Sequence, residues 1–112
     1  ISVVAGSLEK DGWSFDDGES VVPDPVFGAR HLRDVYAAAM EDYTGRVTVP
    51  VLWDRETNTI VNNESSEIIR MLNSAFDDFG DSSVDLYPEA WRAEIDACLT
   101  VAQQSPYQAN RF

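Results

Sequence analysis

The dipeptide Val49-Pro50 is the feature of this 112-residue sequence that most directly suggests chemistry. It lies within Val47 to Trp53, a run of β-branched and aromatic residues that predicts a strand. Proline cannot donate to a sheet ladder, so it is confined to edges, bulges or a retained cis peptide. A cis bond here would turn the backbone N–H and C=O of Val49 outward, where an extended peptide could pair with them. The alternative is an edge-strand proline that only prevents aggregation.

Glu64 and Ser65 stand at the start of a predicted helix, after a second predicted strand at Thr59 to Val61. Free backbone N–H groups and the helix dipole make such a terminus attractive to an anion. The Ser65 hydroxyl could donate to a ligand's carboxylate, and Glu64 could accept from a neighbouring ammonium group. Alternatively, both are ordinary first-turn residues that favour the helix by about 0.3 to 1 kcal/mol.

Trp13 and Arg46 are the other candidate binding residues. Trp13 is an aromatic residue in a polar segment, where such a side chain often contacts a ligand or partner. The alternative for Trp13 is a loop anchor that packs on the domain. Arg46 is either a cation for a ligand's carboxylate or a plain surface arginine.

The elements that would position these residues follow the order strand, loop, helix, strand, strand, helix, linker, helix. Ile1 to Ala5 predicts the first strand, and residues 6–24 predict a long irregular loop. A helix is predicted from Leu32 to Met40, because its apolar face recurs at helical spacing and comprises Leu32, Val35, Tyr36, Ala39 and Met40. The two strands described above form a hairpin that follows this helix.

After the hairpin, a helix is predicted from Ser65 to Phe76, with Asn63 as its N-cap. Its apolar face is expected to comprise Ile68, Ile69, Leu72 and Phe76. The acidic segment of residues 77–85 predicts a linker, and a last helix is expected from Pro88 to about Ser105-Pro106. The apolar stripe of that helix is expected to comprise Trp91, Ile95, Cys98, Leu99 and Ala102.

Two segments carry a resemblance to a known family. Residues 44–54 read TGRVTVPVLWD, and residues 60–73 read IVNNESSEIIRMLN. Together with the hairpin between them, they resemble the glutathione-binding half of a thioredoxin-fold glutathione transferase. The sequences of these two segments are most similar to the Xi class, the glutathionyl-hydroquinone reductases. The resemblance covers nearly the whole of this chain, but the chain covers only the middle of the family's proteins.

This resemblance implies an α/β, thioredoxin-like fold for residues 1–79, lacking the first strand and helix of a glutathione transferase N-terminal domain. Residues 80–112 would then hold a linker and the first helix of an all-α C-terminal domain. In the Xi class the nucleophile is a cysteine in a Cys-Pro-Trp motif on the first strand-to-helix turn, and this sequence has no such motif. We therefore expect the nucleophile upstream, and no catalytic residue and no activity in this chain alone.

The resemblance also implies the ligand and the residues that bind it. Glutathione would be a co-substrate, its cysteinyl unit paired with the Val49 backbone and its γ-glutamyl end held by Glu64 and Ser65. The glutathione-binding residues so implied are Trp13, Arg46, Val49, Glu64 and Ser65, with Pro50 structural at the site. We therefore expect the Val49-Pro50 peptide to be cis. The full protein would be a homodimer that reduces glutathionyl-hydroquinones through an enzyme mixed disulfide. The alternative is a non-catalytic thioredoxin-like binding module of a larger protein.

Composition narrows the classes of function. Twenty acidic and eight basic residues give a formal net charge of −12, which argues against nucleic-acid binding. The sequence has no run of 18 apolar residues and no secretory signal, so we expect no membrane partner and a cytoplasmic protein. The single cysteine, Cys98, suits a reducing compartment, and its place on an apolar stripe predicts a buried core thiol. His31 lacks a second ligand in a suitable spacing, so no metal is expected.

Overall fold

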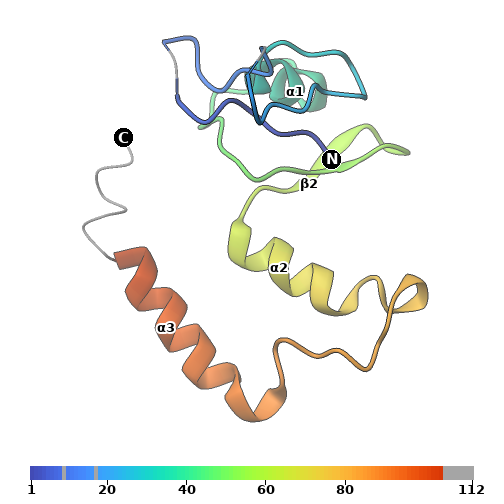
Figure 1. The fold of residues 1–112 in the computed structure, drawn as a ribbon, viewed down its shortest axis with the longest axis vertical. Coiled ribbons are helices and arrows are strands. Elements are labelled where there is room, and N and C mark those ends of the chain that lie inside the picture. Colours follow the sequence, from blue (N-terminus) through green and yellow to red (C-terminus); the bar gives the residue numbers. More distant parts are fainter. Residues whose placement is uncertain (9, 17, 105–112) are drawn as a thin grey trace. The chain divides into compact units, whose positions relative to one another are not determined.

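The computed structural model describes residues 1–8, 10–16 and 18–104, with only the backbone of residues 102–104. It divides into two compact units, Ile1–Glu64 and Ser65–Phe112 (Figure 1). The predicted domain boundary after residue 79 concerns the whole protein and stays a prediction. The described elements are α1 (Leu32–Ala39), β1 (Leu52–Asp54), β2 (Thr59–Asn62), α2 (Ser65–Ser74) and α3 (Arg92–Gln104), with 3-10 turns η1 (Asp77–Phe79) and η2 (Glu89–Trp91). None of the helices in this described part combines the length and apolar character needed to span a bilayer.

Helix α1 is the centre of the first unit, and its position confirms the predicted helix. Leu32, Val35 and Tyr36 are the buried core side chains, spaced at i, i+3 and i+4 as on one helix face. The Asp34 carboxylate accepts the backbone N–H of His31 at 3.0 Å, which satisfies a donor just before the first turn. Partly buried apolar residues from the preceding loop and the hairpin pack against this core.

The segment before α1 is less regular than predicted at its start. Val3 and Val22 exchange two backbone hydrogen bonds of 2.9 and 3.0 Å as an isolated antiparallel bridge, and the N–H of Ala5 bonds to Ser14. The expected strand from Ile1 to Ala5 is therefore wrong, because its partners come from two separate points of a Gly- and Asp-rich loop. Those points cannot form a continuous ladder.

A buried carboxylate organises the end of that loop, where the sequence indicated only irregular structure. Asp24 is 9 % exposed and accepts the backbone N–H groups of Val26, Phe27 and Ala29 at 3.0, 2.9 and 3.1 Å. Burial raises the pKa of Asp24, but the hydrogen bonds from the three N–H groups together outweigh burial, so its pKa lies below the ordinary value. The aromatic ring of Phe27 in this turn meets Trp53 edge-on, with centroids 5.1 Å apart.

Strands β1 and β2 form the predicted hairpin as an antiparallel pair, with Trp53 opposite Ile60 and Asp54 opposite Thr59. The first strand is shorter than predicted, because the ladder begins only at Leu52. Upstream, Pro50 has no N–H, and the backbone of Thr48 is bonded to a side chain of α1 instead.

The second unit contains α2, the linker and α3. Helix α2 begins at Ser65 as expected but ends at Ser74. Asn63 was expected to cap it, which is wrong: the residue that directly precedes α2 is Glu64, and the Asn63 amide donates to Tyr36 instead. Of the predicted apolar face only Ile68 is buried, whereas Ile69 and Leu72 are each 61 % exposed. The described part of this unit offers only the linker and α3 to cover that face.

Within the second unit, Asp96 of α3 is hydrogen-bonded to both the linker and α2. Its carboxylate accepts the Tyr87 hydroxyl, which is shared between the two oxygens at 2.7 and 2.8 Å, and a hydrogen bond from Arg70 of α2 at 2.5 Å. The hydrogen bond from Tyr87, with that from Arg70, lowers the pKa of Asp96. The Arg70 guanidinium also lies 5.0 Å from the centre of the Tyr87 ring. This cluster, which sequence patterns did not reveal, ties the linker and both helices together.

Cys98 on α3 is exposed, so the expectation of a buried core thiol is wrong for the described chain. The predicted helical spacing of Ile95, Cys98 and Leu99 is confirmed, because all three lie on α3. Ile95 and Leu99 are only half-buried, however, because few described residues cover this face of the helix. The expected end of this helix at Ser105-Pro106 lies outside the described residues.

Candidate functional site

Val49 presents an open stretch of backbone, as the sequence predicted. The Val49-Pro50 peptide is cis, which confirms that prediction. In the described part of the chain, neither the N–H nor the C=O of Val49 bonds to another residue, and its side chain is exposed. One donor and one acceptor are thus free to pair with an extended ligand.

Thr48, the residue before Val49, is held in place by hydrogen bonds to Tyr36 of α1. The Tyr36 hydroxyl donates to the C=O of Thr48 at 2.9 Å and accepts the N–H of Thr48 at 3.3 Å. The same oxygen accepts a hydrogen bond from the Asn63 side-chain amide at 3.1 Å. One buried hydroxyl therefore brings together the segments that carry Val49 and Glu64.

Glu64 lies at the end of the first unit with an exposed side chain. Its backbone N–H donates to the side-chain oxygen of Asn62 at 2.7 Å, an Asx turn that sets the direction of the chain. Among the described residues, none bonds to its carboxylate. The carboxylate is therefore available to accept from a ligand's ammonium group.

Ser65 is the first residue of α2 and belongs to the second unit. It is exposed, and its hydroxyl makes no hydrogen bond to the described residues. This position matches the predicted helix terminus, and its role in ligand binding stays a prediction.

Arg46 is exposed, and its guanidinium has no carboxylate partner in the described part of the chain. Arg30, Arg33 and Arg70, by contrast, are each within ion-pair distance of an aspartate. The backbone of Arg46 is held, because its C=O accepts the hydroxyl of Tyr43 at 2.8 Å. Gly45 allows this approach, since a Cβ atom at that position would overlap the Tyr43 ring.

Trp13 is half-buried and packs against the core formed by α1. Its C=O accepts the backbone N–H of Leu32 at 2.9 Å, so the residue is attached to the start of the helix. The structure thus shows the anchoring contacts of the loop-anchor alternative. A contact between Trp13 and a ligand stays a prediction.

The free groups around Val49 suit an extended, zwitterionic peptide. They are a backbone donor and acceptor at Val49, a cation at Arg46 and a carboxylate at Glu64. None of these groups is a thiol or another strong nucleophile, and their role in binding such a ligand stays a prediction. Among residues 1–8, 10–16 and 18–104, no group of three or more His, Cys, Asp or Glu side chains is placed to hold a metal ion.

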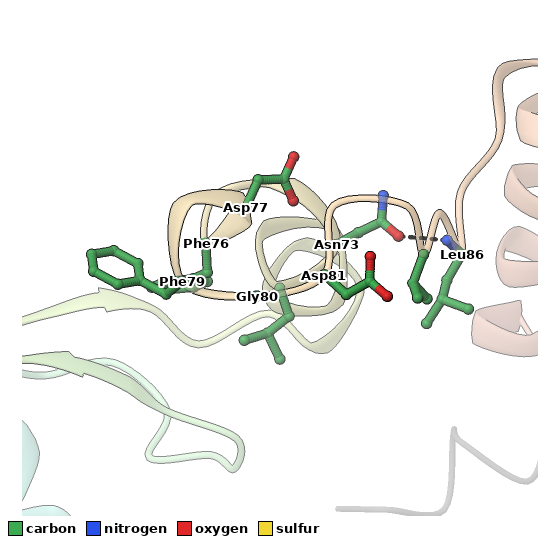
Figure 2. Close-up of a pocket in the computed structure, with 9 residues that line it drawn as sticks. Asn73, Phe76, Asp77, Phe79, Gly80, Asp81 and Leu86 are labelled. Carbon is green, nitrogen blue, oxygen red and sulfur yellow. Dashed lines mark hydrogen bonds between the residues drawn. The ribbon is translucent and has the colours of Figure 1, made fainter.

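A separate hollow of about 240 Å³ lies in the second unit and contains none of the predicted site residues (Figure 2). Its lining comprises Leu72, Asn73, Phe76, Asp77, Phe79, Gly80, Asp81, Val84 and Leu86. The Asn73 side chain accepts the N–H of Leu86 at 2.6 Å and donates to Asp85 at 3.0 Å, so its amide serves to fold the linker back onto α2. We regard the hollow as a result of that turn.

Tyr36 and Asn63 are the site-forming residues that sequence reasoning missed. Tyr36 was recognised only as part of an apolar helix face, and Asn63 only as a helix cap. The one available signal was a tyrosine on a core-facing stripe, because a buried hydroxyl needs a hydrogen-bond partner.

Comparison with known proteins identifies the family. Residues 15–75, more than half of the chain, match the family model for the glutathione S-transferase N-terminal domain. The chain belongs to the glutathione S-transferase family. The thioredoxin-like fold of that domain, which the resemblance implied, is thereby confirmed.

The predicted resemblance to the Xi class is also confirmed. The glutathionyl-hydroquinone reductase PcpF of Sphingobium chlorophenolicum is 54 % identical over 96 residues, which are 86 % of this chain and 31 % of the reductase. The crystal structure of glutathione transferase Xi 1 from Trametes versicolor is 51 % identical, with a TM-score of 0.78 over 86 % of this chain and 35 % of that one. The glutathione-bound structure of YqjG from Escherichia coli K-12 is 46 % identical, with a TM-score of 0.80 over 86 % of this chain and 32 % of that one. The chain therefore spans about a third of the length of these relatives.

Proposed function

We propose that this chain is the glutathione-binding middle portion of a longer enzyme that reduces glutathionyl-hydroquinones to hydroquinones. The observation that carries the proposal is the open backbone of Val49, beside Pro50, in a chain of this family. A relative named as a glutathionyl-hydroquinone reductase, 54 % identical to this chain, supports the substrate class.

In this proposal glutathione is a substrate that lies extended across the first unit. Its cysteinyl N–H and C=O pair with the backbone of Val49 as a short added strand. Arg46 attracts its glycyl carboxylate, and Glu64 accepts from its α-ammonium group. Ser65, the next residue, donates its hydroxyl to the α-carboxylate, where the N-terminus of α2 also favours negative charge.

The thiol chemistry belongs to a cysteine outside this sequence, since Cys98 is the single cysteine here and lies on α3. A thiolate of that other cysteine attacks the glutathione sulfur of the substrate. A sulfur–sulfur bond forms, the carbon–sulfur bond breaks, and the released hydroquinone carbon takes up a proton. A second glutathione thiolate then attacks the mixed disulfide, which regenerates the enzyme thiolate and yields glutathione disulfide. The residues of this chain hold the glutathionyl part in place during both steps.

The test is an assay of the full-length protein with a glutathionyl-hydroquinone and glutathione. We expect one equivalent each of hydroquinone and glutathione disulfide. S-methylglutathione in place of the second glutathione should stop the reaction after a single turnover, because it binds but cannot resolve the disulfide. Binding of glutathione without any turnover would instead support a non-catalytic binding module. Sedimentation equilibrium of the same protein tests the proposed homodimer.

A further inference from the structure

The hydroxyl of Tyr36 uses its full hydrogen-bonding capacity on two segments of the site. A phenol donates one hydrogen bond and accepts two. Here it donates to the C=O of Thr48 at 2.9 Å, and it accepts from the N–H of Thr48 at 3.3 Å and from the Asn63 amide at 3.1 Å. The residue is 2 % exposed, so water cannot take over any of these bonds.

The ring that carries this hydroxyl has little freedom to move. Tyr36 belongs to the core of α1 together with Leu32 and Val35, and its ring packs on that of Tyr43 with centroids 4.8 Å apart. The oxygen is therefore a fixed point, and Thr48 and Asn63 are both tied to it. Each of these residues directly precedes a proposed ligand-binding residue, Val49 in one case and Glu64 in the other.

We infer that Tyr36 is a positioning residue, whose hydroxyl sets the spacing between the Val49 backbone and the Glu64 carboxylate. This inference rests on the proposed function. The two groups would contact different parts of one glutathione molecule, so a change in their spacing weakens one contact whenever the other is made. A phenylalanine would fill the same core space, but it would leave Thr48 and Asn63 free to shift.

The experiment measures glutathione binding by titration calorimetry in the full-length protein and in the variants Tyr36→Phe, Asn63→Ala and the double variant. We expect each single variant to raise the dissociation constant for glutathione by about 5- to 30-fold, the range of a lost buried hydrogen bond. The double variant should bind no more than about twofold more weakly than Tyr36→Phe, because both changes break the same connection. In turnover assays the KM for glutathione should rise while kcat at saturating glutathione stays within about twofold.

Tyr87→Phe is the matched control, because it also removes a hydrogen-bonded tyrosine hydroxyl, but one that donates to Asp96 and makes no bond to Thr48 or Asn63. It should lower the melting temperature without raising the dissociation constant. If Tyr36→Phe lowers the melting temperature but leaves glutathione affinity unchanged, Tyr36 is only a core residue and the inference fails while the proposed function stands. If the unchanged protein does not bind glutathione, both fail. If Tyr36→Phe does not fold, Asn63→Ala decides, with unchanged affinity again refuting the positioning role.

Discussion

Replacing Asp24 by Ala should release the turn that leads into α1. The carboxylate accepts three backbone N–H groups, from Val26, Phe27 and Ala29, at distances of 2.9 to 3.1 Å. A hydrogen bond to a charged group contributes about 1.5 to 3 kcal/mol, but these three share two oxygens, and the N–H groups of the exposed Val26 and Phe27 can regain water. We therefore expect the free energy of local unfolding of this turn to fall by about 2 to 4 kcal/mol, well below the sum for three separate hydrogen bonds.

Hydrogen exchange of the three amides in the full-length protein measures this loss directly. A change of about 2 to 4 kcal/mol corresponds to a fall in protection of roughly 30- to 900-fold. Asp24→Asn, which keeps one acceptor oxygen, should fall about halfway between Asp24→Ala and the unchanged protein in free energy.

The pH dependence gives a second, independent readout. The folded pKa of Asp24 lies below its ordinary value, so the carboxylate's stabilisation is complete above the unfolded pKa of about 3.9. It is lost as the pH falls through the folded pKa. The difference in protection between the unchanged protein and Asp24→Asn should thus be constant from about pH 5 to 8 and shrink below about pH 4.

Asp81→Ala is the control for this prediction. Asp81 also accepts two hydrogen bonds in a turn, from the N–H and the hydroxyl of Ser83, but it is exposed. Asp81→Ala should lower the free energy of local unfolding by no more than about 0.5 kcal/mol, as is usual for surface substitutions. Equal losses for Asp24→Ala and Asp81→Ala would refute the argument that burial of the carboxylate makes its bonds important.

Three further predictions concern the ligand and the thiol of the full-length protein. Ser65→Ala should weaken glutathione binding by about 1 to 3 kcal/mol, the size of a lost hydrogen bond to a carboxylate. Ser74→Ala, at the other end of α2, should leave the affinity unchanged. If the Ser65→Ala variant binds glutathione as tightly as the unchanged protein, the proposed role of Ser65 is ruled out. Arg46→Gln should raise the dissociation constant for glutathione about 3- to 10-fold at low salt and less at high salt, as calorimetry at two ionic strengths would show; a salt-independent effect would argue against an ion pair. Cys98→Ser should keep the turnover rate with a glutathionyl-hydroquinone within about twofold. A large loss of turnover would contradict the proposal that Cys98 takes no part in the thiol chemistry.

Local patterns in the sequence were sufficient for the elements that frame the site. The β-branched runs on either side of a polar turn predicted the hairpin, and apolar spacing predicted α1 and the start of α2. In both cases the signal lies within about ten neighbouring residues. For the Val49-Pro50 peptide the local pattern left an edge-strand proline open, and the resemblance to the glutathione transferases favoured the cis form that the structure has.

The predictions that failed depended on what the rest of the chain provides. Ile1 to Ala5 has the composition of a strand, but a strand also needs a continuous partner, and among the described residues of the loop only Val22 and Ser14 bond to this segment through their backbones. Cys98 has the spacing of a core residue, but a helix face is buried only where other residues cover it. Composition and period describe which face of an element could be buried, and they do not say whether it is.

The connection between Tyr36 and Asn63 shows the same limit at the site itself. Both residues were assigned local roles, Tyr36 in a helix face and Asn63 in a helix cap, and each role accounted for its residue type. Their hydrogen bond joins positions 27 residues apart, so no local pattern contains it. Asn63 could in principle have capped α2, but its side-chain amide donates to the buried Tyr36 hydroxyl instead, and the N–H of Glu64 bonds to the Asn62 side chain. The hydrogen bond to the buried Tyr36 oxygen sets the direction of the Asn63 side chain. In our inference the same bond also sets the position of the adjacent Glu64 relative to the proposed ligand.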